Sequence, residues 1–126
     1  MRDIKFRVWD KQIQIWLDND EYVIKPNSGS VAEIDYSDGY VVIAADNHDA
    51  VLEQYTGLKD KNGVEIYEND IVYIPLNQAA YLNNTKEKVS YSKHGELLAG
   101  IVMLSRVHQA VEVIGNINEN ADLLEE

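Results

Sequence analysis

The chain of 126 residues contains no cysteine. This absence excludes disulfides, thiolate metal sites and cysteine nucleophiles. The sequence also lacks an apolar run of about 18 residues, the length that a membrane-spanning helix requires. No apolar run follows residues 1–5 as it would in a signal peptide. We therefore expect a cytoplasmic protein that does not contact a membrane.

Glycine and histidine are scarce, and their spacing excludes several kinds of site. None of the seven glycines lies in a Gly-x-Gly or Walker arrangement, and no Gly-x-Ser-x-Gly elbow is present. No two of His48, His94 and His108 are three to five residues apart, as zinc ligands often are. Asp46, His48 and Asp49 form a polar cluster, which we interpret as a capped turn. The chain is therefore predicted not to be an enzyme, with no catalytic, cofactor-binding or metal-ligating residue and no cofactor.

Acidic residues are so numerous that their pairing in the sequence carries little information. Glu68 and Asp70 could share a strand face, but a solvated sheet edge explains them better than a hydrolytic pair does. Residues 60–63 resemble the middle of an EF-hand loop. With the glycine of this segment at the sixth position, Leu58 and Asn69 occupy the first and last ligand positions, and neither suits calcium. We interpret the segment as a hairpin turn.

Basic residues are few. There are 11 Lys and Arg against 22 Asp and Glu, so the net charge is −11. Because affinity for duplex nucleic acid depends on neutralising phosphates, we expect no nucleic-acid partner. Two segments are mildly basic, however: residues 1–11 and residues 86–108. If they lie side by side they form a small basic patch, and this is the basis of an alternative function; otherwise they balance charge within the molecule.

A period of two in the apolar residues predicts β-structure near the N-terminus. Residues 4–8 and 13–17 each alternate apolar and polar side chains, which is typical of half-buried strands. A turn at residues 10–11 would join them as a hairpin. Residues 18–30 are polar and are predicted to form a loop.

The next segment mixes strand signals with one helix signal. Residues 31–36 and 40–44 are predicted strands around a turn at residues 37–39. Residues 46–49 could cap a helical turn that begins at Ala50, since Asp and Asn side chains bind free backbone N–H groups.

Glycines mark a turn and an irregularity farther along. Asn62 and Gly63 predict a type I′ hairpin turn, in which both residues require φ > 0, with residues 54–59 and 64–67 as its arms. Gly115 interrupts an apolar alternation, which indicates a bulge or a close backbone approach.

The remaining chain predicts further strands and an irregular end. Strands are expected at residues 71–74, 89–91 and 97–104. Residues 76–84 could form one helical turn or a loop. Residues 116–126 are predicted to form a short turn and a frayed tail.

Short strands with turn residues between them indicate a mainly β protein with little helix, built as a small barrel. The aromatic residues are two Trp, eight Tyr and one Phe. Tyr and Trp are enriched at interfaces, but they also pack across strands. The sequence leaves both interpretations open.

Three segments resemble the YopX family of phage and prophage proteins. They are RDIKFRVWD at residues 2–10, LEQYTGLKDKNG continuing as VEIYENDIV at residues 52–72, and VEVIGNI followed by NEN at residues 111–120. The family typically has Gly where this chain has Asn69, and Asn is the commonest other residue in left-handed backbone. The segment 75–106 matches nothing specific.

The resemblance implies a small SH3-like barrel with an N-terminal β-hairpin extension. We assign residues 1–50 to the extension and residues 51–126 to the barrel, together forming one compact unit. The family is encoded in phages and prophages of Gram-positive bacteria, its biochemical role is not established, and no catalytic residues come with it.

These observations lead to an expected function and two alternatives. We expect a non-enzymatic protein-binding or assembly module in the host-cell cytoplasm, with an unknown phage or host protein as partner. Exposed sheet edges and aromatic residues favour a homo-oligomer. The first alternative is a nucleic-acid-associated module that uses residues 1–11 and 86–108. A small Mg²⁺-dependent hydrolase or nuclease is the less favoured second alternative.

Overall fold

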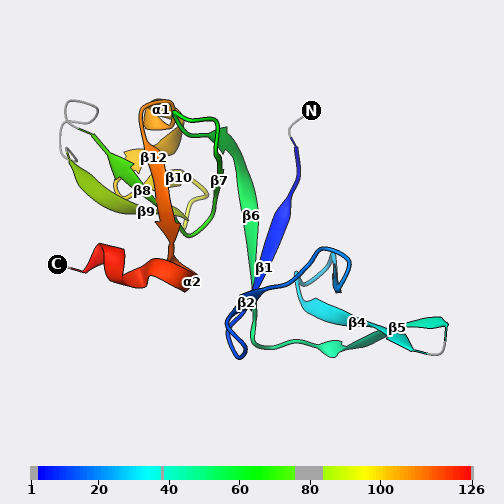
Figure 1. Ribbon diagram of the computed structural model, residues 1–126. Helices are drawn as coiled ribbons and strands as arrows, with labels where there is room; N and C mark the ends of the chain where they lie inside the picture. Colours follow the sequence, from blue (N-terminus) through cyan, green and yellow to red (C-terminus); the bar gives the residue numbers. More distant parts are fainter. Residues whose placement is uncertain (1–2, 38, 76–83, 126) are drawn as a thin grey trace. The chain divides into compact units, whose positions relative to one another are not determined.

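β-strands dominate the structure, and its helices are short. The computed structural model describes residues 3–37, 39–75 and 84–125, with 50% strand and 11% helix. The strands form curled sheets (Figure 1). The prediction of a mainly β protein with little helix is confirmed, while the likeness to SH3 barrels stays a prediction.

The chain divides into two units. The N-terminal unit is Phe6–Glu53, and the C-terminal unit combines Met1–Lys5 with Gln54–Glu126. The sequence suggests a division after residue 50, and the contacts put it after residue 53. Strand β6 (Ala50–Lys59) therefore begins in one unit and ends in the other.

The N-terminal unit begins with the predicted hairpin. Strand β1 (Phe6–Asp10) pairs antiparallel with β2 (Ile15–Trp16), and Trp9 lies opposite Trp16. Their rings meet edge to face with centroids 5.0 Å apart, a favourable geometry for two aromatic rings. The hairpin is confirmed, and these two tryptophans serve as cross-strand packing residues.

The predicted burial of alternate side chains in these two strands is confirmed only in part. Val8 and Leu17 are buried, whereas Ile4, Ile13 and Ile15 are exposed. The connection is a turn over residues 11–14, longer than the expected two residues. Residue 13 therefore belongs to the turn, and the second arm is too short to continue the alternation.

A second sheet of the N-terminal unit has the strand order β3-β4-β5. Strand β3 (Tyr22–Ile24) lies inside the predicted loop 18–30, so that prediction is wrong there. It forms because it pairs with the first residues of β4. The polar residues around it give no sequence signal for this pairing. Strands β4 (Val31–Ser37) and β5 (Tyr40–Asp46) confirm the two strands predicted around residue 38. The buried core of this unit consists of Val8, Leu17, Tyr22 and Val31.

The helical turn predicted from Ala50 does not form, because β6 starts at that residue. The backbone N–H of Ala50 donates to the carbonyl oxygen of Asn47 at 3.3 Å, and the side-chain Oδ1 of Asn47 accepts from the N–H of Asp49 at 3.0 Å. The polar residues thus make a tight turn between two strands. The helix prediction fails because the chain from Ala50 is one continuous strand as far as Lys59, and strand pairing replaces helical hydrogen bonds.

The C-terminal unit contains a five-stranded sheet with the order β11-β10-β9-β8-β12 and the hairpin of β6 and β7. Its further elements are β7 (Glu65–Tyr67), β8 (Asp70–Ile74), β9 (Thr85–Tyr91), β10 (Leu97–Ala99), β11 (Val102–Met103), α1 (Leu104–Val107), β12 (Glu112–Asn116), α2 (Ile117–Asn120) and the 3-10 helix η1 (Ala121–Leu124). The buried core consists of Ile66, Val72, Ile74, Val89, Ala99, Leu104, Val107 and Val111. Alternate residues of β8 and β9 supply part of this core, as expected for strands with one buried face.

The hairpin at Gly63 exists, but its turn type differs from the prediction. Gly63 has φ +79°, whereas Asn62 is not among the residues with positive φ, so a type I′ turn is wrong. The N–H of Gly63 donates to the carbonyl oxygen of Asp60 at 3.1 Å, and the N–H of Asp60 donates to that of Val64 at 2.8 Å. This arrangement is a three-residue hairpin loop in which only the glycine is left-handed.

Two other positions behave as the sequence predicts. Asn69 has φ +65°, so this asparagine does occupy left-handed backbone. Gly115 lies at a register shift between β12 and β8, and a Cβ there would be 2.6 Å from Oδ1 of Asn120. Gly115 therefore marks both a bulge and a close approach.

The last third of the chain corrects two predictions. The strand expected at residues 97–104 is divided by Gly100, with φ +65°, into β10 and β11, and Leu104 begins α1. Residues 116–126 hold α2 and η1 where a turn and a frayed tail are expected; Asn116 caps α2 by accepting from the N–H groups of Asn118 and Glu119. Apolar run length alone does not reveal a left-handed glycine or a side-chain cap. The prediction for residues 76–84 falls mostly on residues 76–83, which lie outside the described part.

Candidate protein-binding surface

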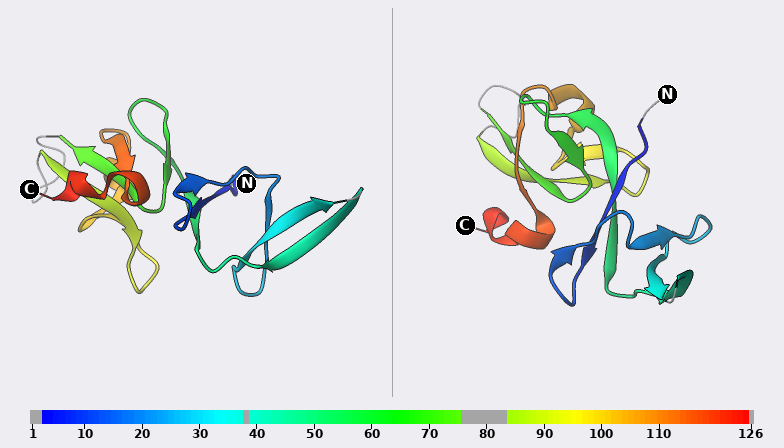
Figure 2. Two further views of the ribbon diagram at one scale, coloured as in Figure 1. Left: turned by 60° about the horizontal axis from the view of Figure 1, so that its bottom comes forward. Right: turned by 45° about the vertical axis from the view of Figure 1, so that its right-hand side comes forward.

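Strands β4 and β5 form a two-stranded ribbon that continues beyond β3. Strand β3 pairs only with residues 31–33 of β4, while β4 and β5 pair as far as Ser37 and Tyr40. The views in Figures 1 and 2 show the two strands side by side over this length. We call residues 34–37 and 40–45 the exposed ribbon.

Large side chains of the exposed ribbon face solvent. Tyr40 is 74% exposed, Tyr36 is 63% exposed and Ile43 is 58% exposed. The hydroxyl of Tyr36 donates to the backbone carbonyl of Asp20 at 2.8 Å, which holds this ring against the neighbouring loop. Aromatic and β-branched side chains grouped on one exposed element are typical of contact surfaces between proteins.

The exposed edge of the ribbon carries no charged side chain until its end. Residues 40–45 contain none, and Asp46 follows them. Asp46 pairs with Lys25, with 2.7 Å between Oδ1 and Nζ. This hydrogen bond from Lys25 lowers the pKa of the Asp46 carboxyl, against the opposing effect of burial. The uncharged stretch contrasts with the acidic character of the chain as a whole.

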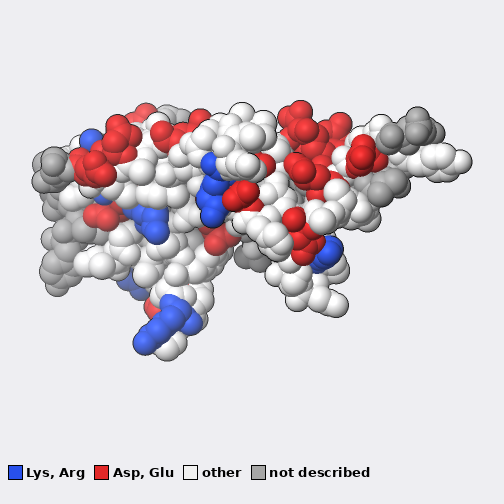
Figure 3. All heavy atoms as spheres, turned by 90° about the horizontal axis from the view of Figure 1, so that it is seen from below, with Lys and Arg blue, Asp and Glu red and all other residues white. Residues whose placement is uncertain are grey.

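Two of the four basic residues in the N-terminal segment bind carboxylates. Lys5 forms an ion pair with Glu65, and this hydrogen bond raises the pKa of Lys5. Arg7 Nε donates to Glu53 Oε1 at 2.8 Å, and Glu53 is fully buried. On the face drawn in Figure 3, basic side chains lie among acidic ones. These pairs reduce the positive charge that residues 1–11 could offer to a phosphate backbone.

We predict that the protein does not bind duplex DNA at physiological salt, because its net charge is −11 and two of its N-terminal cations are paired. Fluorescence anisotropy of a labelled duplex at about 0.15 M salt should show no change up to micromolar protein. A salt-sensitive rise at submicromolar protein would contradict this expectation and favour the nucleic-acid alternative.

The residues predicted to form a capped turn, Asp46, His48 and Asp49, border a hollow of about 460 Å³. Its lining includes Asp10, Asp46, His48 and Asp49. Among the residues that the structure describes, no group of three His, Cys, Asp or Glu side chains could hold a metal ion. Asp10 is instead bound within the protein: Asn47 Nδ2 donates to its Oδ2 at 3.0 Å.

We predict that Asn47→Ala destabilises the N-terminal unit in a pH-dependent way. The side chain of Asn47, with the backbone N–H groups of Ile13 and Gln12, lowers the pKa of Asp10 although burial opposes this. A carboxyl with a lowered folded pKa stabilises above its unfolded pKa of about 3.9, and this contribution is lost as the pH falls through the folded pKa. The melting temperature of the variant should lie below that of the wild type at pH 7, and the difference should shrink in acid.

The control for this measurement is Gln12→Ala, because Gln12 binds Asp10 through its backbone N–H, which the substitution keeps. A wild-type-like pH profile is expected for it. A destabilisation by Asn47→Ala that is the same at neutral and acidic pH would contradict the role of Asp10.

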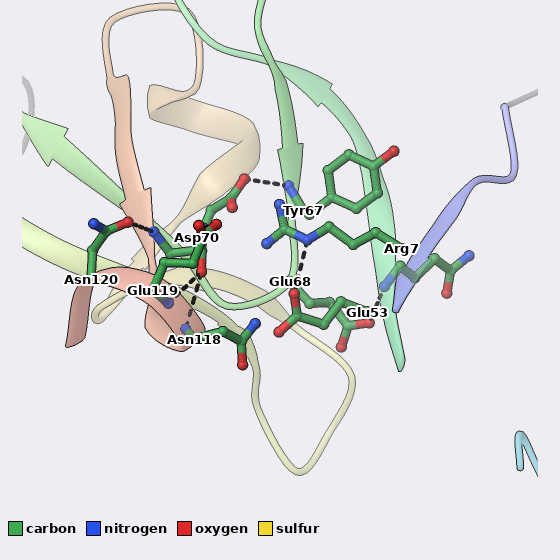
Figure 4. Close-up of polar contacts among 10 residues, drawn as sticks. Arg7, Glu53, Tyr67, Glu68, Asp70, Asn118, Glu119 and Asn120 are labelled. Carbon is green, nitrogen blue, oxygen red and sulfur yellow. Dashed lines mark hydrogen bonds and ion pairs between the residues drawn. The ribbon is translucent and has the colours of Figure 1, made fainter. Parts of the chain in front are cut away.

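Polar side chains of the sequence motif at residues 52–72 accept hydrogen bonds from backbone N–H groups of the same motif. Asp70 Oδ2 accepts from the N–H of Tyr67 at 2.7 Å (Figure 4). Glu68 Oε1 accepts from the N–H of Gln54 at 2.8 Å. The pair considered as hydrolytic carboxylates therefore has structural hydrogen bonds in the fold.

The Asp60 carboxylate accepts three hydrogen bonds from backbone N–H groups. Its Oδ1 accepts from the N–H groups of Asn62 and Val64 at 2.8 and 2.9 Å, and its Oδ2 accepts from that of Val113 at 2.9 Å. Burial raises the pKa of this carboxyl, but the three donors and Lys61 outweigh burial, and the net result is a lowered pKa. The motif thus ties the hairpin loop to β12, and the EF-hand-like spacing has a structural origin.

Some aromatic residues are buried in the fold and others are exposed to solvent. Trp9 and Tyr55 are buried, and the Tyr55 ring lies 5.5 Å from that of Tyr67 between centroids. Tyr36 and Tyr40 are exposed on the ribbon. The sequence shows a strand at this place but contains no signal for its exposure, because exposure depends on where β3 ends.

Comparison with known proteins identifies the family. A model described as YopX protein matches residues 5–125. The chain belongs to the YopX family. A search of curated proteins finds no match.

Two solved structures resemble this YopX family member over nearly their whole length. Protein EF1440 from Enterococcus faecalis is 27% identical, with a TM-score of 0.67 over 99% of this chain and 100% of that chain. The protein yopX from Bacillus subtilis is 22% identical, with a TM-score of 0.59 over 100% of this chain and 98% of that chain. These likenesses support the fold. No helix within the described residues is long and apolar enough to cross a membrane.

Proposed function

We propose that this YopX family member is a phage or prophage protein that acts without catalysis, by binding other protein chains in the host cytoplasm. The single observation that carries this proposal is the exposed ribbon of the N-terminal unit. It presents Tyr36, Tyr40 and Ile43 on strands whose outer residues β3 does not cover.

The physical argument rests on the cost of leaving such a ribbon in water. An isolated two-stranded hairpin is marginally stable, and three or more strands or a packed face are usually needed. Here the pairing of β4 with β5 extends four residues past the last residue of β4 that β3 covers, from Ile34 to Ser37. A partner that covers Tyr36 and Ile43, which strand alternation places on the same face, would remove apolar surface from water and so favour a complex.

Site-specific photocrosslinking tests the proposal. A photoreactive phenylalanine analogue replaces Tyr40 in the full chain, which is then expressed in a lysogenic Gram-positive host and irradiated. We expect covalent adducts with protein at this position. The matched control places the same analogue at Tyr91, an exposed tyrosine of β9 outside the ribbon, where few adducts are expected.

Adducts are identified by mass spectrometry of cross-linked peptides, which separates a second copy of the chain from a different protein. An absence of protein adducts at Tyr40, or equal yields at the two positions, would overturn the proposed function. Adducts with either kind of protein support it.

A further inference from the structure

We infer that the outer edge of β5 binds β5 of a second copy of this chain, as an antiparallel strand pair across a two-fold axis. This inference rests on the proposed function and names its partner and its surface. The feature that carries it is the free backbone edge of β5, which is the last strand in the order β3-β4-β5.

The direction of the backbone groups follows from the register. In an antiparallel strand the N–H and C=O of one residue point to the same edge, and those of successive residues point to opposite edges. The N–H of Ile34 donates to Glu21 on the β3 side, at 2.8 Å, so the backbone of Ile34 points away from β5. Ile43 lies opposite Ile34 and must therefore direct its own N–H and C=O outward.

By the same alternation, the backbone N–H and C=O of Val41 also point to the outer edge of β5. The register between β4 and β5 is unbroken from Ile34 opposite Ile43 to Ser37 opposite Tyr40. Among the described residues, no backbone hydrogen bond involves the N–H of Val41 or Ile43 on this outer edge. The register of β4 with β5 shifts between Ala32 and Ile34, so the regular edge of β5 ends at Ile43.

The segment is complementary to itself. When two copies pair antiparallel with the two-fold axis at Val42, Val41 of each copy lies opposite Ile43 of the other. Each of these two residue pairs can form two backbone hydrogen bonds, about four in total. Tyr40 then lies opposite Ala44, a large residue against a small one. Every residue in this register is uncharged.

Charge opposes this register only weakly although the chain is acidic. Within β5 the first carboxylate, Asp46, lies four residues from the centre, so the two copies of Asp46 are roughly 27 Å apart at about 3.4 Å per residue. This separation exceeds the Debye length of about 8 Å at physiological salt, so their repulsion is largely screened. A basic peptide would find no acidic side chain among residues 40–45 to bind. β5 of a second copy, in contrast, offers a matching apolar strand.

The pairing is short, and its affinity is correspondingly modest. A contact of about five residues per copy buries less than the roughly 1,200 Å² of a permanent interface. We therefore expect a weak monomer–dimer equilibrium. The dimer should become detectable at protein concentrations of tens to hundreds of micromolar; a dissociation constant of about 1 mM marks weak binding.

Sedimentation equilibrium of the purified full chain over about 1 µM to 1 mM tests the inference. The wild type should shift from 14.3 kDa towards twice that mass as concentration rises. Ile43→Pro removes an outward N–H without removing a bond to β4, and proline is tolerated on edge strands. Ile43→Lys keeps the N–H but adds a charge that protects edges from pairing. Both variants should raise the dissociation constant at least tenfold, while Ile43→Val should leave it close to that of the wild type.

Circular dichroism and melting curves establish that the variants fold; if Ile43→Pro does not, Ile43→Lys decides the question. A wild type that stays monomeric up to about 1 mM would overturn the inference, as would a dimer that both folded variants retain. If the Tyr40 crosslinks form only with a different protein and the purified chain is monomeric, the proposed function stands and self-pairing is rejected. If no crosslink forms with any protein, the proposed function itself fails.

Discussion

Replacing Asp60 with alanine is expected to lower the free energy of unfolding by about 2–4 kcal/mol. The carboxylate is buried and accepts three backbone N–H groups, two in its own hairpin loop and one from Val113 in β12. Alanine provides no acceptor, and a hydrogen bond to a charged group contributes about 1.5–3 kcal/mol. Because net stabilities are about 5–15 kcal/mol, this loss is a large fraction of the total. Chemical denaturation with a tryptophan or circular dichroism signal measures it.

Asp60→Asn is the matched control. The amide oxygen can still accept from Asn62 and Val64, whereas the amide nitrogen cannot accept from Val113. We expect an intermediate stability. If Asp60→Asn and Asp60→Ala were equally destabilised, the loop hydrogen bonds would contribute little and the assigned role of Oδ1 would be wrong.

Replacing Gly63 with valine should destabilise the protein by about 1–3 kcal/mol. Gly63 has φ +79°, and a Cβ there would have no atom within 4 Å, so the cost comes from backbone strain without a steric clash. A β-branched residue is strongly disfavoured in left-handed backbone. The melting temperature measures the effect, and Gly63→Asn should lose less because asparagine tolerates this region.

Lys61→Val provides the control within the same loop. The N–H of Lys61 donates to the carbonyl oxygen of Val111 at 3.0 Å, and valine keeps this bond. Its side chain makes only a long ion pair with Glu112, at 3.8 Å and partly exposed, and such pairs contribute little. Equal melting temperatures for Gly63→Val and Lys61→Val would show that the left-handed conformation does not limit this turn.

Local features of the fold could be predicted because one or two residues specify them. Asn69 is left-handed and Gly115 marks a bulge, as their residue types indicate. The strands around residue 38 and the hairpin at Gly63 also follow from short-range patterns. The turn type at Asn62 could not be predicted in the same way, because the buried Asp60 carboxylate binds the N–H of Asn62 and shapes the loop.

Other features were inaccessible to sequence patterns because they depend on distant partners. Strand β3 forms in a polar segment since β4 offers it a ladder, and Ala50 starts a strand since β6 pairs with neighbours far along the chain. The exposure of Ile13 and Ile15 follows from the length of the turn, because Ile13 lies within it and Ile15 directly after it. Helix or strand propensity is a weak prior, and tertiary pairing overrides it.

The sequence by itself determined that this is a mainly β member of the YopX family with excess negative charge, because composition, alternation and a long motif are properties of the chain alone. Only the tertiary structure decided that the polar motif residues bind backbone groups, as Asp60 does, and that β5 is an edge strand with Tyr40 and Ile43 in solvent. The physical reason is that burial and hydrogen-bond partners arise between segments far apart in the chain. A strand has the same sequence pattern whether or not another strand covers its edge.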